Sequence, residues 1–98
     1  MNKNKFDFSN KTAVITGGAQ GFGLDIAKRF LDSGAKVIIW DIDAKLLEKV
    51  LKDINNTNLS SNIVDVSIYR DVEDTVNTIL KKTNILNHFI RIIALIFF

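Results

Sequence analysis

The stretch AVITGGAQGFGLDIAKRF (Ala13–Phe30) joins a β-branched apolar segment to a helical pattern through a cluster of glycines. Four of the five glycines of the 98-residue chain lie within residues 17–23. Before them, Lys11–Thr16 has the length and composition of one buried strand. After them, apolar side chains recur at the spacing of one helix face: Ile26, Ala27, Phe30 and Leu31. The stretch therefore predicts a strand, a tight turn and a helix.

The same alternation continues along the chain. Gly34 stands at the position of a left-handed helix C-cap, and Ala35–Trp40 is a second continuous apolar strand. Asp43 can cap a second helix. The apolar face of this helix consists of Leu46, Leu47, Val50, Leu51 and Ile54. After a loop at Asn55–Asn58, the short apolar segment Asn62–Val66 is the third predicted strand.

A third helix follows, and Ser67 or Asp71 can cap it. Its apolar face consists of Val72, Val76, Ile79 and Leu80. The order β-α-β-α-β-α with continuous apolar strands predicts an α/β fold, in which a parallel sheet with right-handed crossovers is covered by helices on both faces. This three-layer αβα arrangement would hold three to four strands and three helices, which makes it incomplete.

Composition excludes several classes of protein. The net charge is +2 and the basic residues are scattered, so a nucleic-acid-binding surface is not expected. The chain has no cysteine and a single histidine, His88, which excludes disulfides, thiolate metal sites and multi-histidine metal sites. The segment MNKNKFDFSNK is not a signal peptide, and no apolar segment reaches the roughly 20 residues that span a bilayer. We therefore expect a cytoplasmic domain that contacts neither nucleic acid nor membrane.

The position of the glycines indicates a ligand site. In an open parallel sheet, ligands bind outside the carboxyl ends of the strands. Backbone N–H groups of the first turn and of the helix N-terminus can bind an anion such as a pyrophosphate there, and glycine keeps side chains out of the way. Gly17 would allow the sharp exit from the strand, whereas Gly21 and Gly23 would let backbone approach the ligand and the helix approach the sheet. The general G-x-G-x-x-G pattern is not met, because Ile26 occupies the third glycine position, and a GxxxxGK[ST] loop is absent.

Residues Thr16–Gly23 have the pattern TGxxxGxG, which resembles the cofactor loop of the short-chain dehydrogenase/reductase family. The likeness covers about residues 6–83. It implies a Rossmann-type fold and a dinucleotide site. The loop residues that it assigns to the cofactor are Gly17, Gln20, Gly21, Phe22 and Gly23. Phe22 would contribute its backbone N–H rather than its ring. The alternative is a tight strand–helix turn that binds no ligand.

Asp41 ends the second apolar segment, 24 residues after Gly17. A carboxylate at this position can accept hydrogen bonds from the adenosine ribose hydroxyls and would repel a 2′-phosphate. Gln20 and Ile42 bring no positive charge that could pair with such a phosphate. We therefore expect NAD rather than NADP as the cofactor. A solvated strand end that binds nothing is the alternative role for Asp41.

Asp65 and Val66 close the third predicted strand. The family resemblance implies that the Asp65 carboxylate faces the adenine amino group and that Val66 offers backbone contacts. Alternatively, Asp65 is a helix-entry residue beside Ser67, because capping and binding use the same kinds of side chain. Trp40 is expected to pack against a flanking helix rather than to stack on adenine.

The carboxyl-terminal part departs from the family pattern. Complete members continue with a fourth strand, an Asn-Asn-Ala-Gly motif, a catalytic Ser and a Tyr-x-x-x-Lys pair, and none of these is recognisable here. Tyr69 is the only tyrosine and Glu73, not lysine, stands four residues later, so no catalytic residue is assigned. His88 receives no role.

The apolar tail, residues 84–98 of a single partial domain that spans 1–98, is interpreted as part of a truncated chain whose reading frame was disrupted. The alternatives for this tail are a degraded fourth strand, and an amphipathic anchor or dimer strand.

The sequence therefore predicts the NAD(P)-binding portion of an oxidoreductase that transfers hydride between NAD and an alcohol or carbonyl substrate. By itself the chain should bind NAD weakly or not at all and should catalyse no turnover, because the acid–base group is missing. Two alternatives stay open. One is a non-catalytic nucleotide-binding module that docks on a complete homologous subunit. The other is the non-functional product of a disrupted gene.

Overall fold

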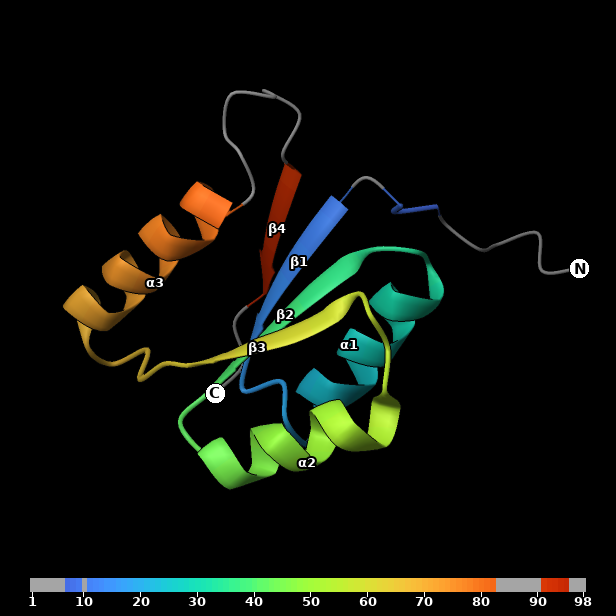
Figure 1. The fold of residues 1–98 in the computed structure, drawn as a ribbon, viewed down its shortest axis with the longest axis horizontal. Coiled ribbons are helices and arrows are strands. Elements are labelled where there is room, and N and C mark those ends of the chain that lie inside the picture. Colours follow the sequence, from blue (N-terminus) through green and yellow to red (C-terminus); the bar gives the residue numbers. More distant parts are fainter. Residues whose placement is uncertain (1–6, 10, 83–90, 96–98) are drawn as a thin grey trace, which may run out of the picture.

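Strands and helices alternate along the part of the chain that the structure describes (Figure 1). The computed structural model describes residues 7–9, 11–82 and 91–95. The elements, in chain order, are β1 (Lys11–Thr16), α1 (Gly21–Asp32), β2 (Lys36–Asp41), α2 (Ala44–Ile54), β3 (Leu59–Ile63), α3 (Tyr69–Lys82) and β4 (Arg91–Leu95). The strands form one parallel sheet in the order β3-β2-β1-β4. This arrangement confirms the predicted incomplete Rossmann-type α/β fold.

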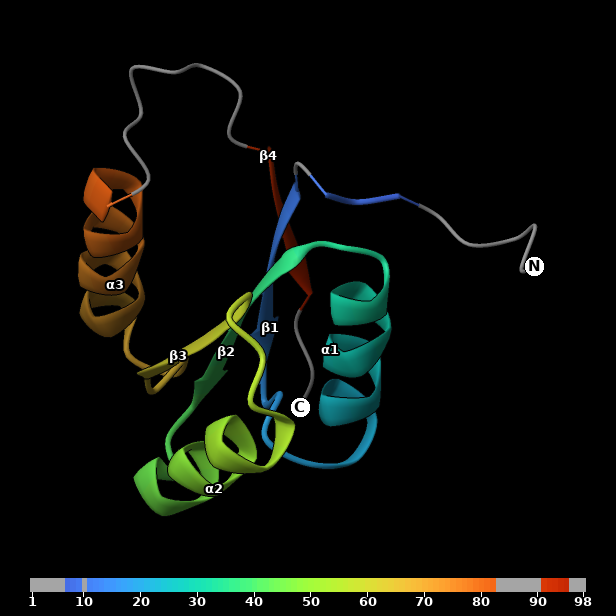
Figure 2. The same ribbon diagram turned by 45° about the vertical axis from the view of Figure 1, so that its right-hand side comes forward.

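The helices cover opposite faces of the sheet, as the continuous apolar strands predicted. Figures 1 and 2 show α1 and α2 on one side of the strands and α3 on the other. Along β1 the side chains alternate: Ala13 and Ile15 join the buried cluster beneath α1 and α2, whereas Val14 joins the cluster on the α3 side. On the first face, Ala27 and Leu31 of α1 and the apolar residues of α2 complete the core.

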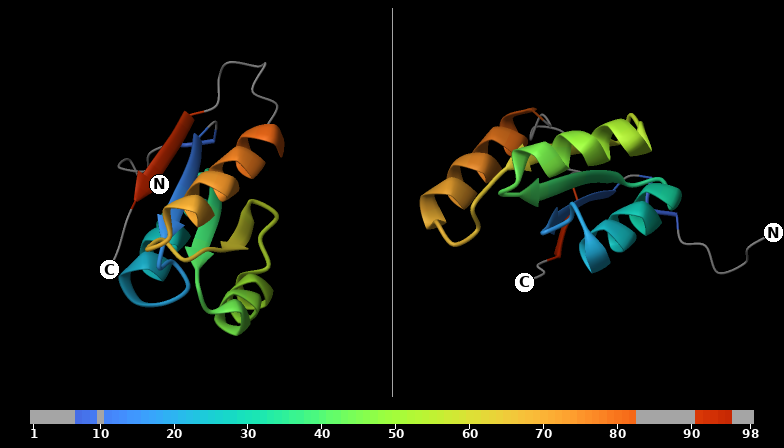
Figure 3. Two further views of the ribbon diagram at one scale, coloured as in Figure 1. Left: turned by 90° about the vertical axis from the view of Figure 1, so that its left-hand side faces the viewer. Right: turned by 90° about the horizontal axis from the view of Figure 1, so that it is seen from below.

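The strand order changes direction at β1. β2 and β3 extend the sheet on one side of β1, and β4 pairs with its other side, from Lys11↔Arg91 to Ile15↔Leu95 (Figure 3). Because all four strands are parallel, their carboxyl ends lie at one edge of the sheet. In open α/β sheets the point where the strand order reverses is where ligands bind.

Helix ends follow the local chemistry that the sequence indicated. The Asp43 carboxylate accepts a hydrogen bond from the Leu46 N–H at 3.1 Å and so caps α2. Gly34 has φ +88° just after α1, which is the left-handed conformation expected of a helix C-cap. Asn55 ends α2 with φ 49°, a conformation that asparagine tolerates better than most residues.

The third strand lies three residues earlier than predicted. Asn62–Val66 was chosen for its apolar residues, whereas β3 occupies the polar segment Leu59–Ile63. β3 is an edge strand that pairs with β2 from Val37↔Leu59 to Asp41↔Ile63. Backbone pairing with β2 fixes its position. Ser60 is exposed and Ser61 and Asn62 are only half-buried, so polar side chains carry little penalty there. Asp65 consequently lies two residues beyond the strand rather than within it.

The start of α3 also differs from the prediction. The helix begins at Tyr69, one residue after Ile68, so neither Ser67 nor Asp71 occupies the capping position. The Ser67 hydroxyl donates instead to the Asp65 carboxylate, and the Asp71 carboxylate accepts from the Asp65 N–H. The two side chains therefore bind the loop that leads into the helix.

A fourth strand is present, contrary to the sequence-based conclusion that none is recognisable. Arg91–Leu95, within the segment assigned to an atypical tail, forms β4 and pairs with β1 over five residues. Five residues suffice for a strand, and the segment is rich in the β-branched side chains that strands favour. Within the tail, residues 91–95 therefore match the fourth-strand alternative, and His88 lies outside the described residues.

Replacing Asp43 tests how much the α2 cap contributes. Asp43→Ala removes the acceptor of the Leu46 N–H and should lower the free energy of unfolding by about 1 kcal/mol, as measured by urea denaturation. Asp53→Ala is the matched control, because Asp53 is exposed in the last turn of the same helix and its charge there is unfavourable. Equal losses in the two variants would contradict the capping role.

Candidate cofactor site

Three strand ends meet at the proposed ligand edge. β1 ends at Thr16 and β2 at Asp41, and the chain leaves β3 at Val64. The Gly17 N–H donates to the Trp40 carbonyl at 2.7 Å, and the Val64 N–H donates to the Asp41 carbonyl at 3.1 Å. The exits of β1 and β3 are therefore both hydrogen-bonded to the end of β2. The glycine turn, Asp41 and Asp65 each lie at one of these three strand ends.

Two glycines of the turn are required by backbone conformation. Gly17 has φ +65° and Gly21 has φ +58°, both in the left-handed region that L side chains rarely adopt. Gly17 makes the sharp exit from β1 that the sequence predicted. At Gly21 a Cβ atom would meet nothing within 4 Å, so the backbone of this residue faces open space. A ligand can approach the main chain at that point.

Gly18 and Gly23 are required by packing instead. A Cβ on Gly23 would lie 2.9 Å from the Gly18 Cα and would overlap the Gly17 carbonyl. A Cβ on Gly18 would lie 2.8 Å from the Ile39 Cγ2. The predicted role of Gly23, the close approach of helix to sheet, takes the form of a contact with the turn. The role of Gly18 was missed, and the sequence signal for it is its place two residues after a buried strand.

The amino end of α1 keeps its N–H groups available. Gln20 is the N-cap residue with extended backbone (φ −159°, ψ 167°), and its side chain makes no capping hydrogen bond. The first turn contains no acidic residue. Phe22 directs its side chain outward and is 81% exposed, so it does not cover the turn by packing onto the core. Uncapped N–H groups at a helix N-terminus favour an anion.

Asp41 is half-buried at the end of β2. Its Oδ1 accepts a hydrogen bond from the Asp43 N–H at 3.1 Å, within its own turn. Among the described residues, Oδ2 has no hydrogen-bond donor. The neighbouring Ile42 is 65% exposed and carries no charge. Asp41 thus presents one oxygen for an external hydroxyl, next to an apolar side chain.

Asp65 is held by the turn that leads to α3. Its Oδ1 accepts from the Ser67 hydroxyl at 2.6 Å and from the Ser67 N–H at 3.0 Å. The hydroxyl and then the N–H of Ser67 stabilise the carboxylate and lower the pKa of Asp65 below its ordinary value. This contact is the turn role that the sequence left as an alternative. Val66, the next residue, is partly exposed at 42%.

Trp40 lies on the α3 side of the sheet rather than in the ligand edge. It is 5% exposed and belongs to a buried cluster with Val14, Val64 and Ile79 of α3. Its packing against a flanking helix is therefore confirmed. The indole Nε1 is buried and has no hydrogen-bond partner among the described residues.

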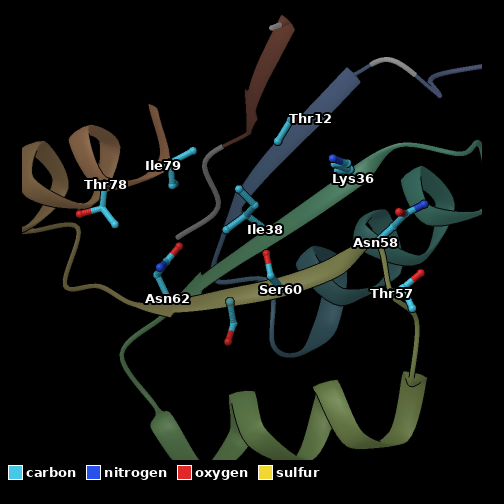
Figure 4. Close-up of a pocket in the computed structure, with 10 residues that line it drawn as sticks. Thr12, Lys36, Ile38, Thr57, Asn58, Ser60, Asn62, Thr78 and Ile79 are labelled. Atoms are coloured by element: carbon cyan, nitrogen blue, oxygen red, sulfur yellow. The ribbon is translucent and has the colours of Figure 1, made fainter. Parts of the chain in front are cut away.

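A groove of about 270 Å³ lies elsewhere, between α3 and the sheet (Figure 4). Thr12 and Lys36 line it from the beginnings of β1 and β2, and Ser60 and Asn62 line it from β3. Figure 4 shows Thr78 and Ile79 on α3, Thr57 and Asn58 on the loop before β3, and the other labelled residues on the strands. None of the predicted site residues lines this groove, so it is separate from the candidate site.

The described part of the chain shows no metal site and no helix that could span a membrane, and its tyrosine is exposed. Tyr69 is the first residue of α3 and is 79% exposed. Among residues 7–9, 11–82 and 91–95, no three acidic, cysteine or histidine side chains gather in a way that could hold a metal ion. The helices described in the structure are all too short or too polar to cross a membrane.

Two glycine substitutions test the packing role of Gly23 and the conformational role of Gly21 separately. Gly23→Ala places a methyl group against the backbone of Gly17 and Gly18 and should cost about 3 kcal/mol of unfolding free energy. Gly21→Ala meets open space and should cost only the strain of its positive φ, about 1–2 kcal/mol. Urea denaturation followed by circular dichroism measures both. A larger loss for Gly21→Ala than for Gly23→Ala would contradict this account.

The Asp65 turn predicts a pH dependence. Because the folded-state pKa of Asp65 lies below its unfolded value, its ionisation stabilises the fold above the unfolded pKa, and this stabilisation disappears as the pH falls through the folded pKa. Ser67→Ala removes the hydroxyl donor, so the Asp65 pKa should rise and the acid loss of stability should begin at a higher pH. Carboxyl NMR titration measures the pKa. Ser60→Ala, in β3, should leave it unchanged.

Comparisons with known proteins agree with this geometry. A family model described as short chain dehydrogenase matches residues 11–92. Short-chain dehydrogenase reductase 3c of Arabidopsis thaliana is 40% identical over 72 residues, which cover 74% of this chain and 28% of that protein. The chain thus spans about a third or less of the length of the relatives it matches.

Solved structures match the same region. A 3-ketoacyl-(acyl-carrier-protein) reductase from Brucella melitensis complexed with NADH has a TM-score of 0.67 at 40% identity, with 74% of this chain and 29% of that chain covered. An NADPH-bound short chain oxidoreductase from Pseudomonas aeruginosa PAO1 has a TM-score of 0.69 at 25% identity, with 78% and 31% covered. Since the family model covers most of the residues, the chain belongs to the short-chain dehydrogenase/reductase family.

Proposed function

We propose that this chain is the dinucleotide-binding portion of an NAD(P)-dependent short-chain dehydrogenase/reductase, a partial Rossmann-type domain over residues 1–98. The observation that carries the proposal is the turn after β1, whose backbone at Gly21 faces open space where three strand ends meet. Family members among the solved structures are complexes with NADH or NADPH. The parent chemistry is hydride transfer between the nicotinamide cofactor and an alcohol or carbonyl substrate.

The loop would hold the pyrophosphate. The uncapped N–H groups at the start of α1 suit an anion, and the backbone of Gly17, Gly21 and Phe22 would approach it, which the open space at Gly21 supports. Gln20 is exposed at the N-cap position, where its amide can contact the same ligand. Gly23 contributes indirectly, because its lack of a side chain brings α1 against the turn.

Asp41 would select NAD over NADP. Its Oδ2 is available to accept a hydrogen bond from a ribose hydroxyl, while its charge would oppose a 2′-phosphate. Ile42 places an apolar side chain rather than a cation beside it. Ser67 binds one oxygen of Asp65, so Asp65 would use its other oxygen toward the adenine amino group. Val66 would contact the adenine through its backbone.

The described residues provide binding without an acid–base group. Tyr69 points to solvent at the start of α3 and Glu73 stands where the family motif has lysine, so neither takes a catalytic role. The substrate pocket and the nicotinamide side of the site would come from protein beyond this chain, such as a complete homologous subunit. We place the chain in the cytoplasm, where a protein without cysteine loses nothing to reducing conditions.

Calorimetric titration tests the proposal with Asp41→Asn. The asparagine Oδ1 can still accept from the Asp43 N–H, so the turn is preserved while the charge is lost. The wild-type chain should bind NADH weakly, with a dissociation constant of about 0.1–1 mM, and NADPH more weakly still. In Asp41→Asn the preference for NADH over NADPH should shrink roughly tenfold, which corresponds to about 1.4 kcal/mol.

Two further variants control this measurement. Gly21→Val fills the space in front of the turn and should abolish binding of both dinucleotides. Asp53→Asn removes an equal charge from the exposed end of α2 and should change neither affinity. An unchanged cofactor preference in Asp41→Asn would refute the role of Asp41, and binding that survives Gly21→Val would refute the site.

A further inference from the structure

Asp71, in the first turn of α3, makes a contact that the start of a helix does not require. The Val72 N–H donates to the Ile68 carbonyl, so Ile68 precedes the first turn and Asp71 is the third residue of the helix. A side chain at this position often accepts from the N–H of the residue that precedes the helix. The Ile68 N–H, however, already donates to the Asp65 carbonyl at 3.0 Å. The Asp71 Oδ2 accepts instead from the Asp65 N–H at 2.9 Å.

This hydrogen bond completes the set that holds the main chain at Asp65. Just before Asp65, the Val64 N–H donates to the Asp41 carbonyl at 3.1 Å. Just after it, Ser67 donates to the Asp65 carboxylate through its N–H and its hydroxyl. The Asp65 N–H itself is part-buried, and Asp71 is its acceptor. Because a part-buried N–H without a partner is unfavourable, the chain at Asp65 would shift if this acceptor were lost.

We propose that Asp71 is a positioning residue of the cofactor site, which holds the Asp65 main chain so that the Asp65 carboxylate meets the adenine amino group. This inference rests on the proposed function, in which Asp65 faces the adenine and Asp41 binds the ribose. Adenine and ribose belong to one nucleoside, so the spacing of the two carboxylates must match it. Binding groups need to be held within about 0.5 Å of their working position by the hydrogen bonds around them. Asp71 acts through Asp65 and does not itself touch the ligand.

The competing role of Asp71 is purely structural. A negative charge in the first turn of a helix is favourable because it interacts with the positive end of the helix dipole. The two roles have different requirements, since the dipole needs the charge, whereas the Asp65 N–H needs an acceptor oxygen. Asp71→Asn removes the charge and keeps an acceptor oxygen, and Asp71→Ala removes both. The two substitutions therefore separate the positioning role from the structural one.

Titration of the full 98-residue chain with two dinucleotides tests the proposal, with the amide signal of Gly21 followed by NMR. NADH carries the 6-amino group of adenine, and reduced nicotinamide hypoxanthine dinucleotide carries a carbonyl oxygen in its place. The Asp65 carboxylate can accept from the amino group but not from this oxygen, so the wild-type chain should bind NADH about tenfold more tightly. Both ligands have the same pyrophosphate and ribose groups, so the ratio of their affinities reports on the base.

Asp71→Ala should reduce this preference to about twofold or less, chiefly through weaker binding of NADH. Asp71→Asn should retain a preference of at least about fivefold, because its amide oxygen can accept from the Asp65 N–H. Asp74→Ala is the matched control, since it removes an equal charge from an exposed position of the same helix and should leave the preference unchanged. An unchanged preference in Asp71→Ala, or equal preferences in Asp71→Ala and Asp71→Asn, would overturn the positioning role.

Amide hydrogen exchange in the unbound chain tests the contact without any ligand. Relative to the Val64 N–H, the Asp65 N–H should exchange at least about tenfold faster in Asp71→Ala than in the wild type, and Asp71→Asn should restore its protection. Equal exchange in the wild type and in Asp71→Ala would overturn the proposal at its first step.

Failure of the proposed function would give a different result from failure of this inference. If the wild-type chain bound neither dinucleotide, the proposed function would be refuted, and with it the role of Asp71 in the site, even where the exchange result held. If the wild-type chain bound both dinucleotides equally, the dinucleotide site would stand. The adenine contact that Asp71 is proposed to position would then be refuted.

Discussion

The contact between the amino end of α1 and the turn after β1 is the constraint on which the site and the main core both depend. Gly23 lies so close to Gly17 and Gly18 that any side chain there would meet backbone atoms, which cannot move aside. The helix therefore starts directly against the strand exit. From that starting point, Ala27 and Leu31 reach the core beneath the sheet. A displacement of α1 would open this core and move the uncapped N–H groups that the proposed site uses.

β2, one of the two inner strands of the described sheet, organises the ligand edge. Its last two carbonyls accept hydrogen bonds from Gly17 and Val64, so the exits of both β1 and β3 are fixed relative to its end. Asp41 is the residue at that end. The proposed contacts to pyrophosphate, ribose and adenine thus share one strand as their reference. Most of these proposed contacts would come from backbone, so they would place few demands on the identity of the side chains.

The sequence predicted the parts of the fold that local physics determines. The strand Lys11–Thr16, the left-handed Gly34 and the Asp43 cap each depend on the residues beside them, and all were predicted correctly. β3 was misplaced because pairing with β2, rather than its own apolar pattern, determines its position. β4 was missed for a related reason, since nothing within Arg91–Leu95 reveals that β1 is its neighbour.

The same distinction applies to the candidate site. The positive φ of Gly17 could be predicted from its place at a strand exit, whereas the packing role of Gly18 depends on Ile39, a residue of the next strand. Position along the sequence also could not separate the two roles of Asp65. The structure shows the turn role directly through Ser67, so any ligand contact of Asp65 must be compatible with it.

The hydrogen bonds at Asp65 connect the proposed adenine side of the site to α3. Among the residues whose burial the structure describes, ten make up the buried cluster under α1 and α2, whereas the cluster that includes α3 has four, and a groove lies beside it. The hydrogen bonds of the Asp65 turn therefore contribute more to holding α3 against the sheet than those of a single turn usually would. The Asp71 carboxylate, in the first turn of α3, accepts from the Asp65 N–H, and Ser67 holds the Asp65 carboxylate. Because these bonds fix the start of α3 relative to the exit of β3, a ligand that contacts Asp65 would also bear on how firmly α3 is held against the sheet.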